Sequence, residues 1–535
     1  MPRRYGHAAV LQAVRELKGP VMSKQSFIYG ALVLLLAASF NRVLGFIYQV
    51  LMVRLILPEG LGLFAMVYPV YVLIIVLATA GIPVAIAKLV AEEMAKNNLT
   101  GAYRIFFTCF VSLILTSVLF SSLCYLCAPF LLAYVFPNPR VYYIFLSLLP
   151  GVIIVALCSA LRGFFQGLQQ MKPTAVSQSF EQLVRVISGL FLAGLLLPRG
   201  VEYAAVGASL GIIAGEFSGF LLMAVFYFKY RPLIPRDARR LPAERPGIMA
   251  ARISSLAVPV TLTRFVSTLF LSLDAIIIPQ RLQVCGLSLA GATAVYGQFV
   301  GIAQSLLFIP GIITISLATA LVPAISDAIS LKNIQLVRAR CETAVRITLL
   351  AGIPFAVIFI LLGDKLCGLI FGYPEAGDSL KILALGGPFL YLHQTTTGIL
   401  HGMGRAALPF KNLVIASLLK ISGIYYLTGM PHLGIQGAAA ATAAACAVMA
   451  VLNLVDIRNL SGFKINYHQV ILKPLTAAAA MSAVIFFSYN ILHDQTAPES
   501  IVVMSSMAAG FLGYMLLLVI NGGVNKKDLL IIKNM

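Results

Sequence analysis

The sequence predicts an all-α polytopic membrane protein with about fourteen transmembrane helices. Of its 535 residues, 60% are hydrophobic and only 11% are charged, whereas soluble domains average about 45 to 50% apolar and about 25% charged residues. Apolar runs long enough to cross a bilayer recur along the whole chain. Because these runs leave only short connections, we expect no extramembrane catalytic domain and no enzyme activity. The sequence has no phosphate loop of the form G-x-x-x-x-G-K-S/T, so we do not expect an ATPase.

The predicted spans are bounded by charged residues or by proline and glycine. Lysine and arginine concentrate in every second connection, as the positive-inside rule requires of cytoplasmic segments. This alternation supports the count and predicts that both termini are cytoplasmic. The formal net charge of +20 therefore indicates topology rather than nucleic acid binding. The spans run near residues 26–50, 62–87, 105–128, 141–167, 174–197, 203–228, 252–279, 292–322, 345–371, 379–402, 409–428, 433–456, 470–492 and 500–522.

Residues 1–21 form a polar N-terminal extension ahead of the first span. The segment Met22–Gln25, with the sequence MSKQ, is typical of a natural start, so translation is expected to begin at either Met1 or Met22. The extension is not predicted to be a signal peptide, because the apolar run after it is about 25 residues long and lacks a small-residue cleavage site.

An internal repeat sets the expected architecture. The sequence LATAGIP at Leu77–Pro83 returns as LATALVP at Leu317–Pro323, and RVISG at Arg185–Gly189 returns as KISG at Lys420–Gly423. Each copy holds six spans, an even number, so both copies have the same orientation, as in parallel-repeat transporters. We therefore expect two lobes facing each other across a cleft, suited to alternating access. The predicted parts are an N-lobe at 22–228, a basic cytoplasmic linker at 229–250, a C-lobe at 251–458, and two further helices with a short cytoplasmic tail at 459–535.

Charged residues inside the predicted spans are the candidate functional residues. A cation at the bilayer midplane costs about 2.5 to 3.5 kcal/mol on insertion scales, so it must face water, an acid or a ligand. The intramembrane cations are Arg42, Arg185, Arg264 and Lys420. The intramembrane acids, which are candidates for ion coupling, are Glu181, Glu216 and Asp274.

The spacing of these charges distinguishes residues that can neutralise each other from residues that are free to bind a ligand. Glu181 and Arg185 lie four residues apart on one helix face, where they can simply neutralise each other. Arg42 has no acid within a turn, and Arg264 is nearly three turns from Asp274, too far for a pair along one helix. Arg42 and Arg264 occupy the equivalent first helices of the two lobes and are placed to meet across the cleft. A cleft with net positive charge favours an anionic substrate, and guanidinium groups bind phosphate bidentately.

The remaining candidates are weaker. Cys124 and Cys127 lie in an apolar helix, where small residues three apart usually pack, so we expect no metal site, no cofactor and no disulfide framework. His393 and His401 have side chains that titrate near neutral pH, which leaves proton coupling open as an alternative.

Several longer motifs resemble a known family along nearly the whole chain from Met22 onward. The chain is similar to the stage V sporulation protein B family of polysaccharide exporters, which belongs to the multidrug/oligosaccharidyl-lipid/polysaccharide flippase superfamily and is related to lipid II flippases. The motifs are SFNRVLGF at 39–46, ATAGIPVAIAKLVAE at 78–92, AVPVTLTR at 257–264, IPQRLQ at 278–283 and LVPAIS at 321–326.

The resemblance implies a transporter that works by alternating access. Members of the superfamily move lipid-linked oligosaccharides or peptidoglycan precursors, or expel drugs, and in spore formers this branch is associated with cortex peptidoglycan. Arg42 matches the first cavity arginine of the related lipid II flippases. The chain departs from them at Tyr48 and Gln49, where those proteins often have a second arginine, and at Ser305 and Phe308, where they have an Arg/Glu pair.

The first functional hypothesis is a flippase for an undecaprenyl-linked saccharide in the bacterial cytoplasmic membrane, with membrane lipids and cell-wall synthesis enzymes as expected partners. Under this hypothesis Arg42, Arg264, Arg185 and Lys420 attract the pyrophosphate. The alternative is a sodium- or proton-coupled cation or drug antiporter, in which Glu216 and Asp274 line the cavity. A non-transporting scaffold for cell-wall enzymes is a third hypothesis, which the charged midplane disfavours because a scaffold has no use for that cost.

Overall fold

The computed structural model describes residues 27–96, 98–230, 246–463, 466–494 and 498–523. Across these residues the regular secondary structure is helical and no strand occurs, which confirms the predicted all-α class. The predicted N-terminal extension 1–21, most of the predicted linker 229–250 and the end of the predicted tail lie outside the described residues.

The first two spans are joined without a loop. Helix α2 (Phe27–Thr79) turns sharply at Leu57, where φ is 61° and ψ is 165°. Pro58 follows at the first position of the second helix, where its fixed φ is favourable and its missing N–H is not needed. A straight helix of 53 residues would be about 80 Å long, far more than the roughly 30 Å hydrocarbon core. The predicted connection at 51–61 was therefore wrong, because both helices continue to the corner.

The remaining helices follow the predicted order. The first lobe continues with α3 (Ile82–Ala95), α4 (Leu99–Tyr134), α5 (Tyr142–Gly167), α6 (Met171–Leu196) and α7 (Val201–Tyr230), with single 3-10 turns at Pro139–Val141 and Leu197–Arg199. The second lobe contains α8 (Pro246–Val284), α9 (Leu289–Gln298), α10 (Ser305–Phe308), α11 (Gly311–Ser330), α12 (Ile334–Phe371), α13 (Ala376–Gly402), α14 (Ala407–Leu427) and α15 (Ile435–Ser461). The last helices are α16 (Lys473–Asp494), preceded by a π-helical turn at His468–Leu472, and α17 (Glu499–Ile520).

The number of spans agrees with the prediction. Within the described ranges, 12 helical segments are long and apolar enough to cross a membrane. The first of these contains two spans separated at Leu57, and α13, at 27 residues, is long enough but more polar. With both corrections the chain has about fourteen spans.

The eighth span is interrupted. It consists of α9, a π-helical turn at Phe299–Gln304 (η4), α10 and α11. A break precedes α11 at Pro310, whose ring is incompatible with a continuous helix. Short π-helical turns inside α-helices occur frequently at functional sites. This span therefore presents an irregular backbone at the middle of its length.

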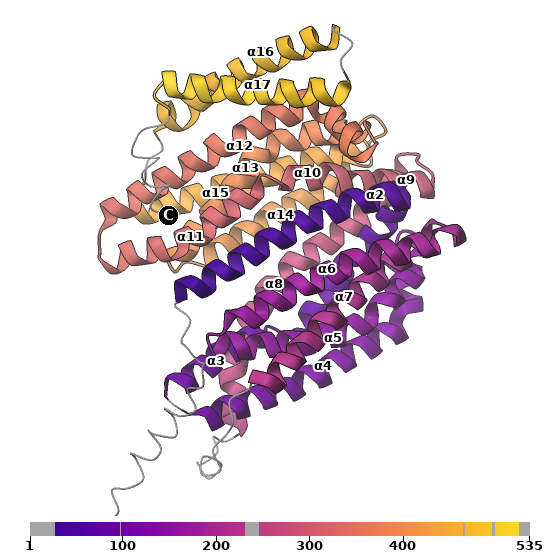
Figure 1. Cartoon of the computed structure of the whole chain (residues 1–535), viewed down its shortest axis with the longest axis vertical. Helices are drawn as coiled ribbons and strands as arrows, with labels where there is room; N and C mark the ends of the chain where they lie inside the picture. The colour runs from indigo at the N-terminus through magenta and orange to yellow at the C-terminus, as the bar shows by residue number, and fades with distance from the viewer. Residues whose placement is uncertain (1–26, 97, 231–245, 464–465, 495–497, 524–535) are drawn as a thin grey trace, which may run out of the picture.

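The helices form two bundles (Figure 1). Helices α3 to α7 lie together on one side, α11 to α15 lie together on the other, and α2 and α8 run between them. The pair α16 and α17 packs on α12 at the outer edge of the second bundle, where the hydroxyl of Tyr514 donates to the carbonyl oxygen of Leu350 at 3.1 Å. The last two helices are thus attached to the second lobe.

The lobes contact each other closely where α2 turns its corner, which we term the Gly62 end. A Cβ atom built on Gly297 would lie 1.9 Å from the carbonyl oxygen of Pro58, and one on Gly62 would lie 2.0 Å from that of Thr293. The amide of Asn138 also donates to the Thr293 hydroxyl at 3.0 Å. Such distances admit only glycine, so this end is closed by direct backbone packing.

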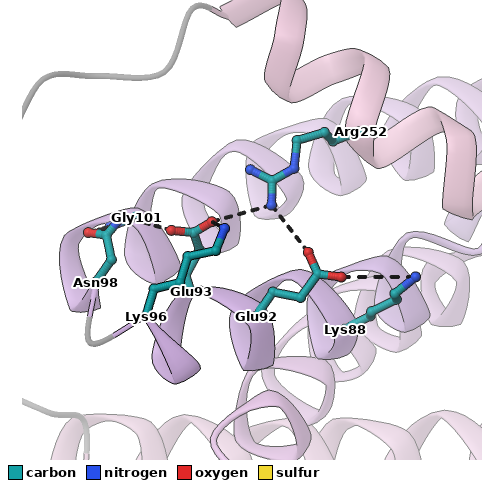
Figure 2. Close-up of polar contacts among 7 residues, drawn as sticks. All are labelled: Lys88, Glu92, Glu93, Lys96, Asn98, Gly101 and Arg252. Carbon is teal, nitrogen blue, oxygen red and sulfur yellow. Dashed lines mark hydrogen bonds and ion pairs between the residues drawn. The ribbon is translucent and has the colours of Figure 1, made fainter.

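The lobes also meet near the N-terminus of α8, at the other end of the molecule from the Gly62 end. We term this region the Arg252 end (Figure 2). The Arg252 guanidinium reaches both Glu92 and Glu93 of α3 at 3.3 Å. Glu93 is buried and also accepts a 2.7 Å hydrogen bond from Asn98, whose side-chain oxygen caps α4 by accepting from the Gly101 amide at 2.9 Å. Contact at this end is therefore ionic and uses a carboxylate that the first lobe already holds in place.

Candidate functional site

A cavity of about 880 Å³ lies where the two bundles meet. This volume is within the range of small-molecule sites, about 300 to 1,000 Å³. Both spans of α2 contribute to its wall from the first lobe, and α8, the broken eighth span, α13, α14 and α15 contribute from the second. The polar residues of the wall are Gln49, Tyr68, Thr268, Asp274, Tyr296, Gln304, Ser305, His393, Gln394, Ser417, Lys420 and Thr442.

An ion pair between Asp274 of α8 and Lys420 of α14 lies in this wall. The two side chains are 17% and 15% exposed, so both are largely shielded from bulk water. The ammonium contacts Oδ2 of Asp274, whereas Oδ1 is buried and has no hydrogen-bond partner among the described residues. The sequence singled out both residues but gave no sign that they pair.

Arg42 and Arg264 are unpaired. Neither side chain makes an ion pair or a hydrogen bond with any residue that the structure describes; Arg42 is half-buried and Arg264 is exposed. Arg42 precedes the lining residue Gln49 by two helical turns, and Arg264 precedes the lining residue Thr268 by one. Residues at these spacings share a helix face. Neither arginine is among the residues that line the cavity, but both share a helix face with a lining residue and lie further along their helices, towards the Arg252 end.

Arg185 belongs to a cluster in the first lobe. One oxygen of Glu181 accepts from Arg185 at 2.6 Å, and the other accepts from Arg162 of α5 at 2.7 Å. The predicted pairing of Glu181 with Arg185 is present, but the sequence gave no signal for Arg162, which lies on a different helix. Two guanidinium groups share one carboxylate here, so both oxygens of Glu181 are occupied.

Glu216 is buried in α7 and accepts a 2.8 Å hydrogen bond from the hydroxyl of Tyr71. It is not part of the cavity wall, whereas Asp274 is. The antiporter hypothesis places both Glu216 and Asp274 in the cavity. Of these two acids, Asp274 lines the cavity and Glu216 does not.

The weaker candidates are separated in the fold. His393 lines the cavity, and its Nδ1 atom is buried without a partner among the described residues, whereas His401 is exposed at the end of α13. Cys124 and Cys127 are free thiols, as are the six other cysteines.

Comparisons with known proteins agree with this architecture. A family model described as "Polysaccharide biosynthesis protein" matches residues 27–329, and one described as "MatE" matches residues 288–426. The chain is 33% identical to "Stage V sporulation protein B" of Bacillus subtilis (strain 168) over 513 residues, which cover 95% of this chain and 98% of that relative. It is 24% identical to "Lipid II flippase MurJ" of the same organism, with 86% and 88% of the two chains covered.

Two groups of solved structures share the fold. A structure described as "Lipid II flippase MurJ, inward closed conformation" superposes with a TM-score of 0.69 at 18% identity and covers 91% of this chain and 97% of that chain. An inward-facing multidrug resistance MATE family transporter superposes with a TM-score of 0.66 at 14% identity, covering 79% of this chain and 94% of that chain.

Proposed function

We propose, from the premise that the chain belongs to the polysaccharide biosynthesis protein family of flippases and transporters, that it moves a lipid-linked saccharide across the cytoplasmic membrane. A peptidoglycan precursor for cell-wall or spore-cortex synthesis is the proposed substrate, carried on an undecaprenyl pyrophosphate. The name of the curated relative that is 33% identical over 95% of this chain, "Stage V sporulation protein B", supports this assignment, as does the similarity to a lipid II flippase.

The observation that carries the proposal is the pair of unpaired guanidinium groups beside the cavity, Arg42 and Arg264. Charged side chains within the hydrocarbon thickness need a compensating partner, and the other two predicted intramembrane cations, Arg185 and Lys420, each have one. A diphosphate offers oxygens on two phosphorus atoms, so each guanidinium can bind it through a bidentate contact. Arg185 shares the Glu181 carboxylate with Arg162, so this cluster keeps a net positive charge, which in this proposal adds positive potential behind the two arginines. Lys420 is neutralised by Asp274.

The proposed orientation places both termini and the Arg252 end in the cytoplasm, because the cations of the connecting segments concentrate there. The lobes, assigned to residues 22–228 and 251–458, are closed at the opposite, external Gly62 end. Once the ionic contact of Arg252 with Glu92 and Glu93 opens, the diphosphate reaches Arg42 and Arg264 from the cytoplasmic side while the lipid tail stays in the bilayer. Rocking of the lobes then exposes the headgroup outside, driven by consumption of the substrate or by an ion gradient.

A second function is favoured by one specific observation. Asp274 lies in the cavity wall, and the "MatE" model covers residues 288–426. A carboxylate in the transport cavity can bind a cationic drug or a coupling ion. An antiporter of this kind would export cationic dyes only in the presence of a sodium or proton gradient.

Reconstitution into liposomes separates the two functions. With purified protein and a fluorescent lipid-linked peptidoglycan precursor, we expect the headgroup to become accessible to a membrane-impermeant quencher at least about tenfold faster than in protein-free liposomes. A fluorescent undecaprenyl lipid without phosphate is the matched control and should not be moved. Dye transport that depends on an ion gradient, without any movement of the headgroup, would contradict the flippase assignment and support the antiporter assignment.

The ionic contact at the Arg252 end yields a further prediction. Replacing Arg252 by Gln removes the interlobe charge and should favour separation at this end by up to about fivefold, because partly exposed ion pairs contribute up to about 1 kcal/mol. Distances between spin labels at Phe228 and Leu331, which are exposed side chains of the two lobes, report the change. High salt should loosen the wild-type contact and leave the variant unaffected.

Lys88→Gln is the matched control, since Lys88 meets Glu92 at 3.9 Å within the same helix and does not join the lobes. The role assigned to Arg252 is refuted if both variants give the wild-type distance distribution.

A further inference from the structure

The cavity wall contains one ammonium group and one carboxylate, Lys420 and Asp274, among the residues that the structure describes there. They come from helices α14 and α8 and contact each other directly. In an empty cavity an unpaired ammonium would carry a large desolvation penalty, so Asp274 compensates Lys420 while no ligand is present. The pair thus keeps this part of the cavity electrically neutral at rest.

The contact between Lys420 and Asp274 is suited to exchange. Asp274 uses one oxygen for Lys420 and leaves Oδ1 without a partner among the described residues, and the ammonium has three donors. The Glu181 cluster differs, because both of its oxygens bind separate arginines. Removing Glu181 would leave two cations without a counter-ion. A carboxylate of the ligand can instead replace the Asp274 carboxylate on Lys420, because both groups accept the same ammonium hydrogen bond.

The position of this pair distinguishes it from the site of the diphosphate. Asp274 follows Arg264 by ten residues on α8, a rise of about 15 Å at 1.5 Å per residue. Neither proline of α8, Pro259 or Pro279, lies between them, so the segment is regular helix. A diphosphate is too short to bridge such a distance. Lys420 is therefore available to a second anionic group, carried by the headgroup deeper in the cavity.

We propose that Lys420 recognises a carboxylate on the saccharide headgroup and that Asp274 is the internal carboxylate it displaces. This inference rests on the proposed flippase function and narrows its substrate class to acidic headgroups. In this proposal the displaced Asp274 carboxylate is satisfied by water in the cavity and by polar groups of the wall such as Ser417 and Thr268. A neutral headgroup would still bind through its diphosphate but would leave the pair intact.

Equilibrium binding to the full chain in lipid nanodiscs tests the proposal. The probes are three fluorescent prenyl diphosphate lipids with a neutral disaccharide, with a disaccharide containing a uronic acid, and with a disaccharide bearing a short peptide that ends in a carboxylate. We expect at least one acidic probe, the one whose carboxylate reaches Lys420, to bind at least about tenfold more tightly than the neutral probe. The two acidic probes show whether the carboxylate comes from a sugar or from a peptide.

Three variants assign the effect to the pair. Lys420→Gln should abolish the preference for the acidic probes over the neutral probe, because the ammonium that binds the ligand carboxylate is gone. Asp274→Asn should strengthen binding of acidic probes several-fold, because the internal competitor is gone. The double variant, which has no buried unpaired charge and therefore remains foldable if a single variant does not, should behave as Lys420→Gln.

The outcomes separate this inference from the proposed function. Equal affinity of the wild type for neutral and acidic probes, or an acidic preference that persists in the double variant, overturns the role of Lys420 while the flippase assignment stands. Failure of the wild type to bind any diphosphate probe overturns the proposed function itself.

Discussion

Replacing Arg42 and Arg264 together by Ala is expected to abolish headgroup translocation while the protein still folds. Neither arginine side chain makes an ion pair or a hydrogen bond with a described residue, so their removal breaks no interaction of this kind within the protein. Each charge-assisted hydrogen bond to a phosphate contributes about 1.5 to 3 kcal/mol. Losing two such contacts amounts to at least about 3 kcal/mol, a fall of about a hundredfold or more in the rate of translocation.

The liposome assay measures this loss, and the thermal midpoint of the purified variant measures folding. Arg199→Ala is the matched control, since Arg199 is an exposed arginine in a short turn and is not among the residues that line the cavity. The double replacement by Lys should restore part of the activity, because an ammonium keeps the charge but loses the bidentate geometry. Wild-type translocation by the double alanine variant would exclude the arginines as phosphate contacts.

Alanine at Gly297 is expected to prevent closure at the Gly62 end. Its Cβ would lie 1.9 Å from the carbonyl oxygen of Pro58, a backbone atom that cannot rotate away. Overpacking of this kind costs about 1 to 3 kcal/mol, enough to shift the population about tenfold or more towards the state open at this end. Distances between spin labels at Tyr134 and Leu287, exposed residues of the two lobes near this end, should lengthen, and translocation should fall accordingly.

Gly194→Ala is the control, because a Cβ at Gly194 meets nothing within 4 Å. It should leave both the label distances and translocation at their wild-type values. If Gly297→Ala gives the wild-type distances and rate, the lobes do not close through this contact during transport.

The spans were predictable from the sequence because the bilayer imposes one simple requirement, about 20 apolar residues for each crossing. The corner at Leu57 was not predictable. A leucine with a φ of 61° is unfavourable by itself, and the contact at this corner is made by the neighbouring Pro58, whose carbonyl packs against Gly297 of the second lobe. The break at Pro310 has a local cause, the proline itself, whereas no residue pattern in the sequence indicated the π-helical turn before it.

The site was predictable only residue by residue. Intramembrane charge singled out Arg42, Arg264, Lys420 and Asp274, since such residues are rarely present without a role. The pairing of Lys420 with Asp274 joins residues 146 positions apart, and that of Arg162 with Glu181 joins two helices. No helical periodicity relates such positions, so tertiary structure alone determines which charges are neutralised and which stay available.

The corner of α2 has a consequence for the reversibility of gating. Its contact with α9 uses carbonyl oxygens and glycine Cα atoms, and Pro58 has no amide hydrogen to leave without an acceptor. The amides of Gly62 and Gly297 lie inside helices, where the helical backbone supplies their acceptors. When the lobes part here, the backbone uncovers no orphaned donor in the low-dielectric layer. The amide of Asn138 does lose an acceptor, the Thr293 hydroxyl. The backbone part of this gate can therefore open and close repeatedly without new acceptors, and the Asn138 amide is a group that water has to satisfy when the lobes separate.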